Sequence, residues 1–151
     1  MATSTGSIIL HGWHRVAVYS TLILLFGSGL AWVLLHYFGI QQGPLGPVSS
    51  PFEYVSLQAH GVLAYAVVFF VGSLLQSHMS RAWRLRRNRA SGLVFACLML
   101  CLTMSGLALY YFVNEDTREW VSLLHWLIGL LLPALLAIHI VLGRRQRRRH
   151  S

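Results

Sequence analysis

The stretch LLHWLIGLLLPALLAIHIVLGRRQRRR, residues 123–149, is a long apolar run that holds two histidines and ends in a cluster of arginines. A helix needs about 20 apolar residues to cross a bilayer. Three similar runs precede this one, which places the expected spans at about residues 13–38, 54–78, 91–113 and 120–143. The connections are short, so the sequence predicts one all-α domain over residues 1–151, an integral membrane four-helix bundle.

The composition agrees with this fold class. Hydrophobic residues make up 56% of the chain and charged residues only 11%, whereas a soluble domain has about 25% charged residues. The four spans account for most of the sequence and leave no segment for a soluble catalytic domain. We therefore expect membrane lipid as the main solvent, and we assign no catalytic residue.

The charges predict the orientation. All twelve basic residues are arginines, and all except Arg118 fall on one side of the membrane if the spans alternate; the four acidic residues fall on the other side. By the positive-inside rule the arginine side is cytoplasmic. Both termini are thus expected to be cytoplasmic, in a multi-pass membrane protein. The run RRQRRR directly follows a span, so it predicts an anchor to anionic lipid and no nucleic-acid partner.

Eight histidines occur in the chain, and ionisable residues within membrane spans usually mark a functional path. His125 and His139 lie fourteen residues apart on the fourth span. On an α-helix this spacing leaves them about 40° apart around the axis and about 21 Å apart along it. They therefore face the same side at two depths, as the ligands of two stacked haems would.

Depth also predicts the partner helices. His60 follows Glu53 by seven residues and His125 follows Glu119 by six, which favours an outer haem between spans two and four. Leu74 occupies the matching position for His139 and cannot bind iron. The inner partner must therefore be His78, one turn deeper, or His14 on the first span, and the spacing does not decide between them. A zinc site is disfavoured because zinc needs three or four ligands close together.

Four short motifs carry a resemblance to a known family: HGWHR at residues 11–15, QAHG at 58–61, LLHW at 123–126 and AIHI at 137–140. Together with the four spans they resemble the bacterial di-haem cytochrome b561 family, which includes the membrane cytochrome b subunits of formate dehydrogenase and nickel-iron hydrogenase. The resemblance implies a location in the bacterial inner membrane and two haem b groups. Their axial ligands to iron would be His14 with His139 and His60 with His125.

The resemblance also implies a function. Such a protein carries electrons across the membrane between a surface-docked redox partner subunit and the quinone pool, as a subunit of a respiratory oxidoreductase. One alternative is a stand-alone quinone-linked oxidoreductase such as a superoxide oxidase, although an anionic substrate would be repelled by the acidic outer loops. The other alternative is a haem-free structural anchor, in which the histidines only form hydrogen bonds between helices.

Overall fold

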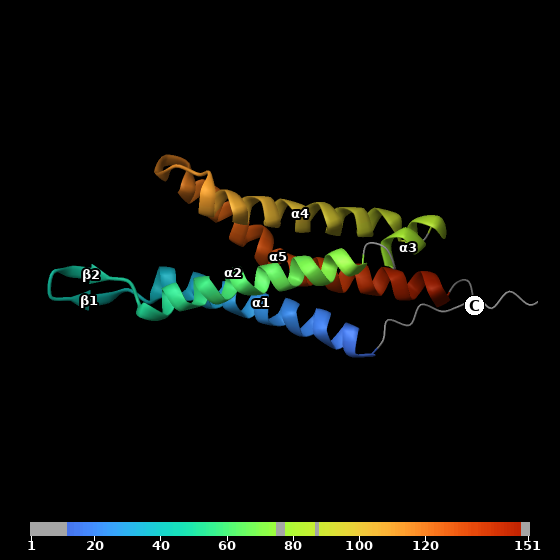
Figure 1. Cartoon of the computed structure of the whole chain (residues 1–151), viewed down its shortest axis with the longest axis horizontal. Coiled ribbons are helices and arrows are strands. Elements are labelled where there is room, and N and C mark those ends of the chain that lie inside the picture. Colours follow the sequence, from blue (N-terminus) through green and yellow to red (C-terminus); the bar gives the residue numbers. More distant parts are fainter. Residues whose placement is uncertain (1–11, 75–77, 87, 149–151) are drawn as a thin grey trace, which may run out of the picture.

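The computed structural model describes residues 12–74, 78–86 and 88–148. Four long helices cross the length of the molecule: α1 (Gly12–Phe38), α2 (Pro51–Leu74), α4 (Arg89–Tyr111) and α5 (Glu115–Arg148) (Figure 1). Each of them contains a stretch that is long and apolar enough to cross a membrane. The predicted all-α membrane bundle with four spans is confirmed.

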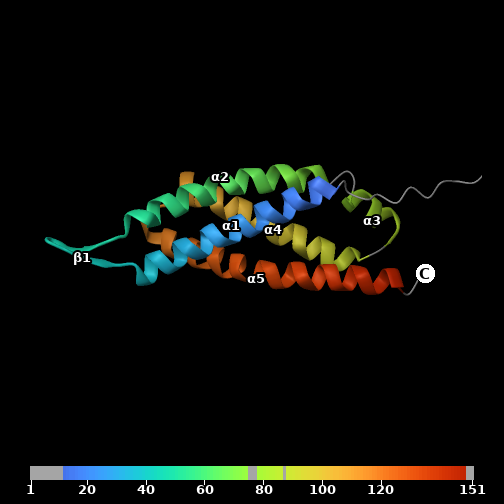
Figure 2. The ribbon, with the colours of Figure 1, turned by 90° about the horizontal axis from the view of Figure 1, so that it is seen from below.

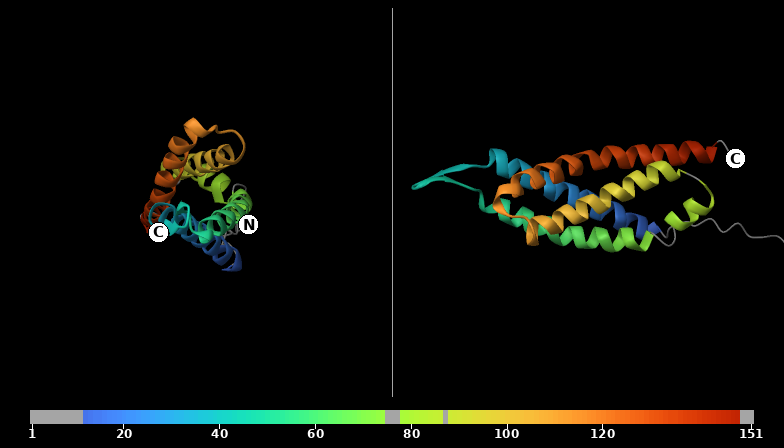
Figure 3. Two further views of the ribbon diagram at one scale, coloured as in Figure 1. Left: turned by 90° about the vertical axis from the view of Figure 1, so that its left-hand side faces the viewer. Right: turned by 90° about the horizontal axis from the view of Figure 1, so that it is seen from above.

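The helices pack as two antiparallel pairs. α1 packs against α2, α4 packs against α5, and α1 also contacts α5. Figures 2 and 3 show the two pairs side by side, with the same four helices seen along and across their axes. The start of α1 and the end of α5 lie at one end of the bundle, next to the short helix α3 (Ser80–Arg84) (Figure 1).

Two of the helices begin earlier than the apolar pattern predicts, because polar residues cap them. α2 begins at Pro51, whose missing N–H costs nothing in the first turn of a helix, and the Ser50 carbonyl accepts a hydrogen bond of 2.9 Å from the Glu53 N–H. α5 begins at Glu115, and the Asn114 side chain accepts a hydrogen bond of 3.2 Å from the Thr117 N–H. Such caps satisfy backbone donors that have no partner within the helix.

The second span differs from its prediction at the other end. The described part of α2 stops at Leu74, and residues 75–77 lie outside the described residues. His78 follows in a short π-helical turn that leads into α3. The end of the predicted range 54–78 is therefore described only at His78, which lies in this π-helical turn.

A β-hairpin joins α1 to α2, which the sequence analysis did not predict. Its strands are β1 (Gln41–Gly43) and β2 (Gly46–Val48), with Gln41 opposite Val48. Gly46 has a φ of 124°, which is accessible to glycine but not to other residues without strain. The hairpin extends beyond the helices at the end opposite α3 (Figure 1).

The surface of the bundle is apolar along the middle of the helices. Among the described residues, the buried hydrophobic side chains are only Val18, Val67 and Met99. By contrast, Ile23 is 70% exposed and Phe69 is 72% exposed, although both lie within spans. Exposed apolar area of this extent is not tolerated in water, and lipid chains cover it in a membrane.

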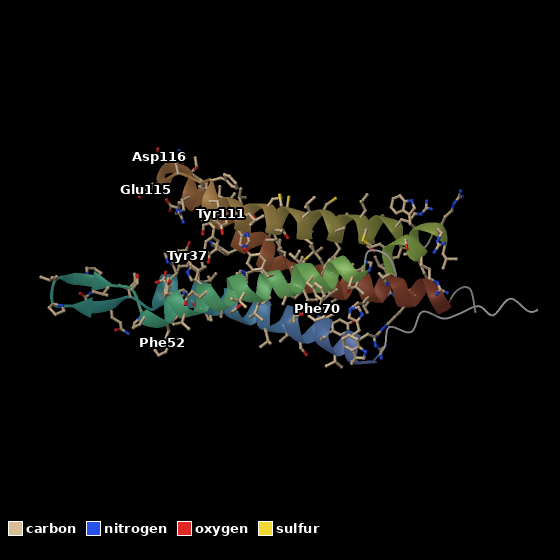
Figure 4. All side chains as sticks on the ribbon, viewed as in Figure 1. Tyr37, Phe52, Phe70, Tyr111, Glu115 and Asp116 are labelled. Atoms are coloured by element: carbon tan, nitrogen blue, oxygen red, sulfur yellow. The ribbon has the colours of Figure 1, made fainter. Side chains whose placement is uncertain are left out.

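Charged residues separate to the two ends of the bundle. Glu115 and Asp116 lie at the hairpin end, as Figure 4 shows, whereas Arg144 and Arg145 lie near the opposite end of α5. This separation fits the predicted orientation, in which the hairpin faces the periplasm.

The orientation can be measured by cysteine labelling. We expect Leu45→Cys at the hairpin to react with a membrane-impermeant maleimide from the periplasmic side, and Gln146→Cys near the end of α5 to react only after the membrane is permeabilised. The matched background is Cys97→Ala with Cys101→Ala, which removes the native thiols. Labelling of Gln146→Cys from the periplasm would reverse the predicted orientation.

Candidate functional site

The structure brings His60 of α2 and His125 of α5 together inside the bundle. Both side chains are partly buried, their ring centroids are 6.3 Å apart, and their planes are inclined at 83°. An imidazole nitrogen lies about 2 Å from a metal that it binds, so two imidazoles on opposite sides of one iron have ring centroids about 6 Å apart. The observed separation is therefore suitable for a pair of axial ligands.

His139 of α5 has a second histidine beside it at the other level. This neighbour is His78, whose ring centroid lies 6.3 Å from that of His139, with the ring planes at 69°. Phe95 stacks on the same ring at 6.1 Å. His139 thus meets one of the two candidates that the sequence left open.

His14, the other candidate, lies against α2. Its Nε2 is 3.0 Å from the Ser73 hydroxyl, and its ring centroid is 6.0 Å from that of Phe70. The structure therefore places the outer pair together as the sequence predicts, and it places His78, not His14, next to His139.

Of the remaining three histidines, the structure describes only His36. His36 forms an ion pair of 2.7 Å with Glu53 and stacks on Trp32, which ties the end of α1 to the start of α2. His11 and His150 lie outside the described residues. None of these three was predicted as a ligand.

A repeated tripeptide, Ser-Gly-Leu, supports three of the predicted ligands. It occurs at residues 28–30, 91–93 and 105–107. In each copy the serine hydroxyl meets the Nδ1 atom of a histidine on a neighbouring helix: Ser28 with His60 at 3.2 Å, Ser91 with His139 at 3.0 Å and Ser105 with His125 at 2.8 Å. The sequence analysis missed these serines, although the repeat itself was a visible signal.

The glycine of each tripeptide gives the imidazole room. A Cβ atom on Gly29 would lie 2.8 Å from Cε1 of His60, which is closer than real Cβ contacts allow. A Cβ atom on Gly106 would lie 3.5 Å from Cε1 of His125, and one on Gly92 would lie 3.6 Å from Cε1 of His139. The imidazoles thus pack directly over small residues, and Gly29 makes the closest approach.

Each of the three serine hydroxyls has a second partner besides the histidine. A serine has one proton to donate, and each of these serines donates it within its own chain segment. Ser28 donates to the Leu25 carbonyl at 2.9 Å, Ser91 to the Asn88 Oδ1 at 2.5 Å and Ser105 to the Leu102 carbonyl at 3.2 Å. When Nε2 of such a histidine binds iron, the proton of the ring lies on Nδ1, and the serine hydroxyl is placed to accept it.

This tautomer leaves Nε2 with a free lone pair, which is the state of a metal ligand. The Leu25 carbonyl, 3.0 Å from Nδ1 of His60, requires the same tautomer because it can only accept. His14 has the opposite arrangement: its Nε2, not its Nδ1, meets a serine hydroxyl, that of Ser73 at 3.0 Å.

The residues fit a haem better than a bare metal ion. No group of three or more His, Cys, Asp or Glu residues that could hold a metal ion exists among the described residues. Two histidines per level suffice for haem iron, because the porphyrin supplies the other ligands. In addition, the buried indole N–H of Trp126, next to His125, has no acceptor in the described part of the chain. Buried donors rarely stay unpaired, and a bound group could supply the acceptor.

Comparison with known families agrees with this donor set. The sequence profile of a family described as prokaryotic cytochrome b561 matches residues 73–151, which is more than half of the chain. The chain belongs to this family. Comparisons with curated proteins and with solved structures give no match. The predicted membership is confirmed, and the matched region includes both histidines of α5.

Family membership establishes the general character of the protein. A cytochrome b carries b-type haem, and in a membrane bundle the haem serves electron transfer across the lipid layer. Cytochromes of this kind generally work with quinone and with redox partner subunits.

The close contact at Gly29 gives a test of the outer site. We expect Gly29→Ala to push the His60 ring from its position and to lower the haem content toward about half that of the wild type, because a packed helix pair does not yield at this distance. The haem content is measured per chain by the pyridine haemochrome spectrum.

Gly27→Ala is the matched control, because a Cβ atom at Gly27 meets nothing within 4 Å. It should retain the full haem content. Equal haem contents in the two variants would show that the contact between Gly29 and His60 is not needed for binding.

Proposed function

We propose that the protein transfers electrons across the bacterial inner membrane through two b-type haems, between a surface-docked redox partner subunit and the quinone pool. In this role it is a subunit of a respiratory oxidoreductase. The observation that carries the proposal is the presence of two histidine pairs, each with ring centroids 6.3 Å apart, at two levels of one bundle.

The outer haem is proposed to bind between His60 and His125. Three observations support this pair: the ring separation, the contact of each Nδ1 with a neighbouring helix, and the small residues Gly29 and Gly106 behind the rings. The haem supplies one-electron chemistry when bound. The chain fixes its two ligands and surrounds them with apolar helices that exclude water.

The inner haem is proposed to have His139 as one ligand. For the second ligand, the family resemblance implies His14, whereas the contact with His139 favours His78. The contact of His14 Nε2 with the Ser73 hydroxyl at 3.0 Å also favours His78, because that nitrogen already has a partner on α2. An experiment on the two histidines separates these assignments.

The short connections between the helices suggest which steps belong to this protein and which to its partner subunit. The described connections are short: a β-hairpin between α1 and α2, and the residues Phe112–Asn114 between α4 and α5. They supply docking surfaces, and we propose that substrate chemistry takes place in the partner subunit. Quinone reaches the bundle from the surrounding lipid.

Haem content in histidine variants tests the proposal. The purified wild-type protein should contain two haems per chain and show a reduced-minus-oxidised spectrum of b type. His60→Ala and His125→Ala should each lose the outer haem, and His139→Ala should lose the inner one, because iron then lacks an axial ligand. His36→Ala is the control and should keep both haems, since His36 pairs with Glu53.

The same measurement decides the inner ligand. If His78 binds iron, His78→Ala loses one haem and His14→Ala keeps both; if His14 binds iron, the two results are exchanged. A wild-type protein without a haem spectrum would contradict the proposed function and would favour a structural anchor.

A further inference from the structure

The hydroxyls of Ser91 and Ser105 have a further consequence for the two haems. Both serines lie on α4, fourteen residues apart, and the hydroxyl of each lies within hydrogen-bond distance of Nδ1 of a histidine on α5. A histidine that binds iron through Nε2 carries its proton on Nδ1, so the serine then accepts. We propose that they are positioning residues that lower the reduction potentials of the inner and the outer haem, respectively, by accepting the Nδ1–H hydrogen bond of an axial histidine. This inference rests on the proposed function.

The physical basis is the charge distribution of the imidazole ring. An acceptor on Nδ1–H draws the proton toward itself and makes Nε2 more electron-rich, so the ring becomes a stronger donor to iron. A stronger donor stabilises the oxidised iron more than the reduced iron, and the reduction potential falls. The apolar surroundings of the spans strengthen the effect, because water does not compete for the hydrogen bond.

The three tripeptides differ in how much each imidazole depends on its serine. His60 donates to two acceptors, the Leu25 carbonyl at 3.0 Å and the Ser28 hydroxyl at 3.2 Å. His60 therefore keeps an acceptor when Ser28 is removed. Ser28→Ala provides a control with the same chemistry and the same tripeptide, but with a predicted weak effect.

His125 and His139 depend on a single acceptor among the described residues. The Nδ1 atom of His125 meets Ser105 at 2.8 Å. The Nδ1 atom of His139 meets Ser91 at 3.0 Å and also lies 3.4 Å from the Asn88 Nδ2. That amide nitrogen carries protons of its own and cannot accept, and it donates to the His139 carbonyl at 3.0 Å. Ser91 and Ser105 are therefore the positions where removal of the hydroxyl matters.

The experiment is a redox titration of the full-length, haem-loaded protein with optical detection of both haems. We expect Ser105→Ala to raise the potential of the outer haem alone and Ser91→Ala to raise that of the inner haem alone. Ser28→Ala should shift the outer haem by much less than Ser105→Ala does. Ser105→Thr and Ser91→Thr, which retain the hydroxyl, should restore potentials close to those of the wild type.

The possible outcomes distinguish this inference from the proposed function. Unchanged potentials in both alanine variants overturn the inference, while two bound haems still support the proposed function. If an alanine variant loses haem and the matching threonine variant keeps it, the hydroxyl has a positioning role. If both variants lose haem, that role is overturned. A wild-type protein that binds no haem overturns both.

Discussion

The arrangement of the site depends on the hydrogen bonds that join α4 to α5 at two depths. The helices are antiparallel, so a step of fourteen residues along α5, from His125 to His139, is matched by an equal step back along α4, from Ser105 to Ser91. Because the two steps are equal, one alignment of α4 along α5 brings both serines level with their histidines. A shift of one helix by a single residue would separate both pairs at once, so the two levels are fixed together.

The four spans could be predicted from the sequence, but the residues at which they begin and the hairpin between the first two could not. Long apolar runs must become helices in lipid, where every backbone polar group needs a partner within the chain. The starts at Pro51 and Glu115 depend on the caps Ser50 and Asn114, which an apolar pattern does not reveal. The β-hairpin was missed because its strands have three residues each and carry no alternating pattern.

The site was predictable where helix geometry applies without interruption. Counting from the outer charges placed His60 level with His125, and the structure brings these two rings together. The same counting placed His78 one turn too deep for His139, yet the rings are neighbours. The count assumed a regular α-helix as far as His78, whereas His78 lies in a π-helical turn, where the rise per residue of an α-helix does not apply. The supporting serines were missed because a serine in a span more often bonds only to its own helix.

The protonation of the outer pair also bears on whether its histidines serve only to hold helices together. Two imidazoles that join helices share one proton, which one ring donates and the other accepts. Here Nδ1 of His60 contacts Leu25 and Ser28 of α1, and Nδ1 of His125 contacts Ser105 of α4. Within the described part of the chain, Nε2 of neither ring has a hydrogen-bond partner, although the two rings are neighbours. A pair that only tied two helices together would be expected to join its rings through these nitrogens. The arrangement therefore favours the proposed haem ligation over the alternative of a structural anchor.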